Sequence, residues 1–267
     1  MPRRDDQVAG LAKALSANGG LKLWSVIVTV LGDLAEGGED EVPGVVLSQL
    51  IERIGLQREA MRVALHRLKR DGWVESRRDG RIGYHRLSVT GRAQTGAVTG
   101  RVYGSGETAA RGWRLAVVPP DQAGVLDEIP EDWPVLPLSR RAAVVAAGGG
   151  PDLPADWLMA EIAEGSWPRW AEELVEAEAC EAEFTGFLGL LAALDIDAVQ
   201  ADPFERLALR VLVLHGWRRL ALRSNPVAES ILGADCAAAR CRRKVLQMLR
   251  DLPRPDLSGL EPGNSGG

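Results

Sequence analysis

The sequence predicts a mixed α+β protein of several domains that begins with a helix-turn-helix unit. Its 267 residues are more than a single hydrophobic core usually holds. Apolar residues recur at helical spacing in two stretches before residue 55, and a link of two residues joins the second stretch to a basic third one. Strand-like segments follow, and helical patterns fill the chain from about residue 168 onward.

The first two helices are predicted from apolar residues spaced three and four positions apart. The first is expected over about residues 21–35, and the second ends at Gly55, which tolerates the left-handed conformation of a helix C-terminus. Only Leu56 and Gln57 separate that glycine from the third helix, and so short a link predicts the sharp crossing of a helix-turn-helix. The apolar positions are Trp24, Ile27, Val28, Leu31 and Leu34, then Leu47, Leu50, Ile51 and Ile54.

The third helix, residues 57–70, is strongly basic on one side. At about 100° per residue, an apolar third of its circumference adjoins a cationic third. Glu59 is the only acid between Arg58 and Arg70, so ion pairs within the helix cannot neutralise the cations. A solvated charged surface is the alternative interpretation. The apolar residues are Met61, Ala64, Leu65 and Leu68, and the cationic ones are Arg58, Arg62, His66, Lys69 and Arg70.

A β-hairpin is predicted directly after the basic helix. Two extended segments, 73–77 and 81–87, flank Asp79-Gly80, a dipeptide suited to a tight turn, and Arg77, Arg78 and Arg81 lie near the tip. A basic helix followed by such a hairpin is typical of a winged helix-turn-helix, in which the helix enters the major groove and the wing reaches phosphates. We therefore predict DNA binding by Arg58, Arg62, His66, Lys69, Arg70, Arg77, Arg78 and Arg81. A winged helix that contacts only protein is the alternative.

The charge distribution favours an anionic partner for this segment. The whole chain has a net charge of −5, but residues 44–92 hold 11 basic and 5 acidic residues, a net charge of +6. Long-range attraction depends on this local field rather than on the total charge.

The remaining chain divides into a small α+β segment and a helical one. Residues 96–106 are expected to be a linker, followed by strands at 113–118, near 136–138 and at 142–147, and by a helix at 155–165. The predicted domains are an N-terminal arm (1–20), the winged helix (21–95), a middle domain (101–165), a C-terminal helical domain (166–253) and a disordered tail (254–267).

Several motifs resemble the PaaX-like transcriptional repressors of bacterial aromatic-acid catabolism. They are "SVIVTVLGDL", "LSQLIERIGLQREAMRVALHRLKRDGWVESRRDGRIGYHRL", "RVYG", "WRLAVV" and "LVLHGWRRLALR", which together span most of residues 21–250. The resemblance implies a ferredoxin-like middle domain and a homodimer on a palindromic double-stranded operator. It also implies release from DNA by an effector such as an aryl acyl-coenzyme A thioester.

The segment "HGWRRLALR" supplies candidate effector contacts. His215, Arg218, Arg219 and Arg223 lie three to four positions apart, so some can share a helix face and meet an anion such as the phosphates of a coenzyme A ester. Arg218 and Arg223 are the effector-site candidates. The alternative is that these arginines pair with the glutamates of residues 172–183.

The sequence offers little chemistry for catalysis. The common nucleophile, nucleotide-binding and zinc-protease motifs are missing, no cofactor or metal site is expected, and Asp195 with Asp197 is interpreted as a turn. Three cysteines without C-x-x-C spacing are expected to be ordinary buried thiols. With no signal peptide and no apolar run of about 18 residues, we expect a cytoplasmic regulator that is not an enzyme. An enzyme or ligand-binding protein whose winged helix mediates protein contacts remains the rival.

Overall fold

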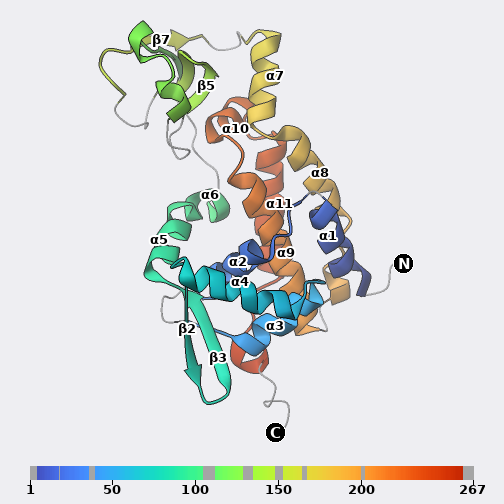
Figure 1. Ribbon diagram of the computed structural model, residues 1–267. Coiled ribbons are helices and arrows are strands. Elements are labelled where there is room, and N and C mark those ends of the chain that lie inside the picture. Colours follow the sequence, from blue (N-terminus) through green and yellow to red (C-terminus); the bar gives the residue numbers. More distant parts are fainter. Residues whose placement is uncertain are drawn as a thin grey trace. The chain divides into compact units, whose positions relative to one another are not determined.

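The computed structural model describes residues 5–17, 19–35, 40–104, 112–128, 135–147, 153–163, 167–199 and 202–260. It confirms the predicted class, because helices are combined with two small antiparallel sheets (Figure 1). The chain forms two compact units: an N-terminal unit (1–104, 189–222 and 243–267) and a central unit (105–188 and 223–242). Each unit combines segments that are distant in sequence. The domain boundaries inferred from the sequence stay a prediction.

The first helices of the N-terminal unit lie where the sequence places them. They are α2 (Leu23–Leu34), α3 (Gly44–Arg53) and α4 (Arg58–Arg70). The apolar stripes of α2 and α3 are buried except for Trp24, which is 51% exposed. Gly55 has a φ of +80°, the left-handed conformation expected of the residue that follows a helix. Helix α4 packs against both α2 and α3, so the short link does produce a compact three-helix cluster.

The hairpin is also confirmed. Strands β2 (Val74–Asp79) and β3 (Ile82–Leu87) pair antiparallel over their whole length, and Gly80 takes a φ of +57° in the turn. A short strand, β1 (Val42–Pro43), pairs with the other edge of β3, which gives the order β1-β3-β2. Figure 1 shows β2 and β3 as a long two-stranded ribbon. The segment before α3 thereby fixes the base of the hairpin.

The N-terminal arm was expected to be loose, and this is wrong. Residues Asp5–Ala17 form helix α1, which packs against α9. Val8, Leu11, Ala12 and Leu15 are buried. Their spacing of three, one and three positions is the pattern of a helix face, but polar neighbours obscure it in the sequence.

The linker expected at 96–106 begins instead with helices. Helix α5 (Val89–Ala97) is capped by Ser88, whose hydroxyl accepts a hydrogen bond from the backbone N–H of Gly91, and α6 (Thr99–Tyr103) follows. The indole N–H of Trp217 donates to the Val102 carbonyl over 2.8 Å. Glycine and small residues have weak helix propensity, so this tertiary contact and the cap stabilise the helices. Residues 105 and 106 lie outside the described ranges.

Helix α9 (Pro203–Ala221) is the central element of the N-terminal unit. Asp202 caps its first turn, and most of its residues are buried on all sides. It contacts α1, α2, α3 and α6. Helix α11 (Ala237–Asp251) ends in the same unit, and Leu260 of the following 3₁₀ turn, Leu257–Leu260, is also buried. Part of the segment predicted to be a disordered tail is therefore ordered, while residues 261–267 lie outside the described ranges.

A buried ion pair connects α2, α9 and the end of α11. Asp33 accepts two hydrogen bonds of 2.7 Å from Arg210, whose side chain is 6% exposed while that of Asp33 is 0% exposed. Arg210 also donates to the carbonyls of Leu249 and Leu252. Such a pair is tolerated in an apolar interior only because both charges are fully hydrogen-bonded.

The central unit is built on a four-stranded sheet. Its strands are β4 (Trp113–Val117), β5 (Val135–Ser139), β6 (Ala142–Ala146) and β7 (Leu158–Ile162), in the order β5-β6-β4-β7 with every neighbouring pair antiparallel. Two 3₁₀ turns, Pro120–Gln122 and Val125–Glu128, follow β4. The helix predicted at 155–165 is wrong, because Leu158–Ile162 pairs with the free edge of β4. Five residues are too few for periodicity to separate a helix from a strand.

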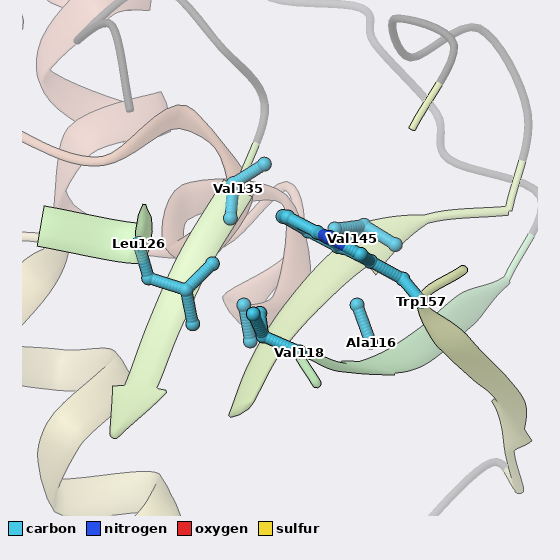
Figure 2. Packing of buried hydrophobic residues seen from close by; sticks show 7 residues of the cluster. Ala116, Val118, Leu126, Val135, Val145 and Trp157 are labelled. Carbon is cyan, nitrogen blue, oxygen red and sulfur yellow. The ribbon is translucent and has the colours of Figure 1, made fainter. Parts of the chain in front are cut away.

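Both faces of this sheet are covered. On one face Trp157 lies beside Val145, above Ala116 and Val118 (Figure 2). On the other, Leu136 and Val144 pack against helices α7 (Arg169–Glu178) and α10 (Pro226–Leu232). Helix α8 (Glu181–Ala192) follows α7. As expected, Cys180, Cys236 and Cys241 are buried free thiols.

The Asp33–Arg210 pair gives the first prediction. Asp33→Ala leaves a buried guanidinium without its carboxylate, so the free energy of unfolding should fall by about 3–5 kcal/mol in a urea titration. Glu183→Gln removes an ion pair whose partners are about half exposed, with Arg223 at 51% and Glu183 at 46%, and should cost less than about 1 kcal/mol. Equal effects of the two substitutions would contradict this account.

Candidate nucleic-acid interface

Helix α4 has one buried side and one solvent side. Met61 and Leu68 are buried, whereas every cation predicted to contact DNA from this helix is exposed. The exposed cations are Arg58, Arg62, His66, Lys69 and Arg70. The helix thus carries its positive charge on the side that faces away from the core of its own unit.

These cations differ in how far they are compensated. Within the described ranges, the side chains of Arg62, His66 and Lys69 have neither a hydrogen bond nor an ion pair. Arg58 lies 3.8 Å from Glu52, and Arg70 lies 3.0 Å from its neighbour Asp71. Water screens ion pairs as exposed as these, so they contribute little to stability. Arg58 and Arg70 can therefore exchange their acidic neighbour for an external anion.

The pairing register of β2 and β3 places Arg77 and Arg78 on opposite faces of the hairpin, and only one of the two has an acidic partner among the described residues. Arg77 lies opposite Tyr84 and stacks on its ring at 4.4 Å, while its guanidinium donates to Glu41, which raises the pKa of Arg77. Arg78 points to the other face, opposite Gly83. Neither Arg78 nor Arg81 has a partner within the part of the chain that the structure describes. Arg77 was grouped with these two by sequence, but its environment differs.

The base of the hairpin is joined to the helices through His85. Its Nδ1 atom lies 2.8 Å from the Ser76 hydroxyl, and burial and then the nearby charge of Lys69 lower its pKa. At Gly44, the first residue of α3, a Cβ atom would lie 3.0 Å from the His85 ring and 3.1 Å from the Gly83 carbonyl. This close approach lets α3 begin directly against the hairpin, so helices and hairpin form one structure.

Sequence reasoning missed two side chains on α4. The first is Val63, which is 55% exposed beside the cationic residues. Its residue type is that of a core residue, and only its angle on the helix indicates the solvent side. The second is Arg67. Its side chain is exposed, and no described residue pairs with it, so it adds to the positive surface.

The two candidate effector arginines have different environments and belong to different units. Arg223, in the central unit, is exposed and pairs with Glu183 at 3.3 Å, as the alternative interpretation expected of these arginines. Arg218, in the N-terminal unit, is half-buried and contacts only the Thr29 hydroxyl, at 3.4 Å, among the described residues. Burial lowers the pKa of Arg218.

His215, in the same segment, is a core residue. It is 2% exposed, with Nε2 2.8 Å from the Gly20 carbonyl and Nδ1 3.1 Å from the Thr29 hydroxyl. Burial, and to a lesser degree Arg218 and Arg219, lower its pKa. The ring is therefore neutral, with its Nε2–H donating to Gly20, and it fixes the position of Thr29.

The remaining candidates are structural. Asp195 accepts hydrogen bonds from the backbone N–H groups of Asp197 and Ala198, so it caps the 3₁₀ turn Asp197–Val199. Among the described residues, no cluster of three histidine, cysteine or acidic side chains is arranged to hold a metal ion. The described helices also include none with the length and apolar character needed to cross a bilayer.

Many DNA-binding proteins combine three helices, a hairpin and an exposed cationic surface in one domain. The particular resemblance comes from a family model described as "PaaX-like protein", which matches residues 22–91. This match confirms the family resemblance over the segment that contains α2, α3, α4 and the hairpin. None of the curated proteins with which the chain was compared matches it.

Proposed function

We propose that this protein is a sequence-specific, DNA-binding transcriptional regulator of the cytoplasm, and not an enzyme. The observation that carries the proposal is the group of exposed basic side chains without a described partner on α4 and the hairpin: Arg62, His66, Lys69, Arg78 and Arg81. A surface of this charge attracts the phosphate backbone and, on binding, releases the counterions condensed on it.

The arrangement of the elements supports a winged helix-turn-helix. Helices α3 and α4 would form the helix-turn-helix, α2 would pack behind them, and the β2–β3 hairpin would be the wing. The order and directions of the four strands in the central unit match those of a ferredoxin-like sheet, with 3₁₀ turns in place of the helix after its first strand. These assignments agree with the layout that the family resemblance implies.

In the proposed complex, α4 enters the major groove. Arg58, Arg62 and His66 contact base edges, since they lie along the solvent side of the first three turns. The hairpin and the end of α4 hold phosphates, which fix the register of the protein without specifying sequence. The phosphate contacts are Lys69, Arg70, Arg77, Arg78 and Arg81.

Regulation would follow from the assembly that the resemblance implies. A homodimer would present two copies of α4 to the two halves of a palindromic operator. An effector, for which an aryl acyl-coenzyme A thioester is the candidate given by the family, would release DNA by binding more tightly to a state with poorer DNA affinity. Arg218 is the better of the two effector-site candidates, because Arg223 already has an acidic partner.

Selection from a pool of random DNA duplexes, followed by titrations at several salt concentrations, tests the function. We expect one enriched sequence with two-fold symmetry, and an affinity that falls steeply as salt rises. Arg62→Ala should relax the preference at one position of each half-site. No enrichment, with weak binding to all duplexes, would instead favour a ligand-binding protein or enzyme whose winged helix contacts protein.

Arg78 and Arg77 provide a matched pair on the hairpin. Arg78→Ala removes an uncompensated cation and should lower the slope of log affinity against log salt by about 0.9. Arg77→Ala should change the slope less, since Glu41 already balances that charge. Arg169→Ala, which removes a 90% exposed arginine from α7, is the control and should leave the slope unchanged. A larger effect at Arg77 than at Arg78 would contradict the proposed roles.

Val63 tests the apolar part of the same interface. In the major groove an exposed valine is placed to contact the methyl group of a thymine. Replacing one thymine of each selected half-site by uracil, which removes only that methyl group, should weaken binding of the natural protein about threefold to tenfold. Val63→Ala should bind both duplexes alike in fluorescence anisotropy. Insensitivity of the natural protein at every thymine position would remove Val63 from the interface.

A further inference from the structure

A small cavity in the N-terminal unit lies between α2, α5–α6 and α9. Its volume is about 50 Å³, enough for a group of a few heavy atoms, and all of its lining residues belong to the one unit. Its wall combines one guanidinium, several hydroxyl groups and aliphatic side chains. The polar lining residues are Thr29, Thr95, Thr99, Tyr103 and Arg218, and the apolar ones include Val28, Val98, Val102 and Leu214.

Among the described residues of this lining, Arg218 is the only one with a charged side chain. It is half-buried, and the one hydrogen bond of its side chain to the described residues is the 3.4 Å approach of Nη1 to the Thr29 hydroxyl. Burying a cation is costly unless an anion or several acceptors replace the water that it loses. The depressed pKa of Arg218 agrees with an environment that supplies too few of them.

A carboxylate beside the cavity wall, that of Asp33, already has guanidinium partners. The Tyr103 hydroxyl, at the cavity wall, lies 3.4 Å from Asp33. That carboxylate accepts two bonds from Arg210 and a third, of 3.3 Å, from Arg254. Asp33 therefore serves two guanidinium groups, and Arg218 does not pair with it.

The hydrogen-bond donors of the cavity indicate the kind of anion. Each threonine hydroxyl has an acceptor within the protein: Thr29 has the Ser25 carbonyl and the unprotonated Nδ1 of His215, Thr95 has the Gly91 carbonyl, and Thr99 has the Thr95 carbonyl. Only the guanidinium is left with free N–H groups, and its planar fork matches the two oxygens of a carboxylate. A phosphate would require more donors than the cavity provides, while the valine and leucine side chains suit a short hydrocarbon group.

We propose that this cavity binds a small monocarboxylate, with Arg218 as its ionic partner and the aliphatic wall covering its carbon atoms. This goes beyond the proposed function, because the binding requires no DNA. A volume of about 50 Å³ does not hold a coenzyme A ester, so the ligand class also differs from the effector that the family resemblance suggests. A ligand here would bridge α2, which packs on the basic helix α4, and α6.

Calorimetry and thermal melting of the full chain test the proposal. Sodium acetate and sodium butyrate are titrated at an ionic strength held constant with sodium chloride, with acetamide and butyramide as uncharged controls of the same shape. We expect the acids to raise the melting temperature in a concentration-dependent way and the amides to leave it unchanged. Failure of both acids to bind would overturn the proposal, whether or not the protein binds DNA.

Variants of Arg218 locate the binding. Arg218→Met keeps the bulk of the side chain and removes a poorly compensated charge, so the free variant should melt at or above the natural temperature. Its affinity for the carboxylates should fall at least about tenfold. Arg250→Gln, on the exposed side of α11, is the control and should bind like the natural protein.

Arg218→Lys provides the second test if the methionine variant does not fold. Lysine keeps the charge but loses the two-bond fork, so its affinity should lie clearly below that of the natural protein. Natural affinity in either Arg218 variant would show that the carboxylates bind elsewhere and would overturn the assignment.

Discussion

The buried contact between Asp33 and Arg210 is the constraint on which the N-terminal unit depends. It joins the end of α2 to the middle of α9, and through the carbonyls of Leu249 and Leu252 it also holds the end of α11. Asp33 and Arg210 are 177 positions apart in the chain. The basic segment from α2 to the β2–β3 hairpin is consequently not an independent N-terminal module. The core that supports it includes residues from the C-terminal part of the sequence.

This dependence explains how the cationic surface can remain uncompensated. The helices behind it are held by apolar burial and by ion pairs such as Asp33–Arg210 and Arg53–Glu205. Arg62 of α4 takes no part in these contacts. Acidic partners occur at a few positions only, such as Glu41 beside Arg77. Basic side chains that form no ion pair within the protein keep their full attraction for an external anion. This attraction is the physical basis of the proposed DNA contact.

The Arg218 cavity follows from the same core. Asp33 is committed to Arg210, and His215 holds Thr29 in place while remaining neutral. The arrangement leaves one guanidinium facing a small space with no acid of its own. Because α2 borders both this cavity and the base of α4, the inferred ligand site and the inferred DNA surface share a structural element.

Local patterns in the sequence determined the helices α2, α3 and α4, the hairpin and the basic surface. In these cases long apolar periodicity, Gly55, Asp79-Gly80 and a dense run of arginines act over a few residues and need no distant partner. Local patterns failed where a distant partner decided the outcome. Leu158–Ile162 became a strand because β4 offered a free edge, and α6 formed where a residue of α9, Trp217, bonds its backbone.

The candidate site divides in the same way. Sequence alone determined which residues could be exposed cations, since helical angle and turn chemistry are local properties. Only the tertiary structure decided that Arg77 is balanced by Glu41, that Arg223 pairs with Glu183, and that no acid of the described residues pairs with Arg218. The physical reason is that compensation of a charge depends on which distant side chains come within a few ångströms of it, and composition does not record that distance.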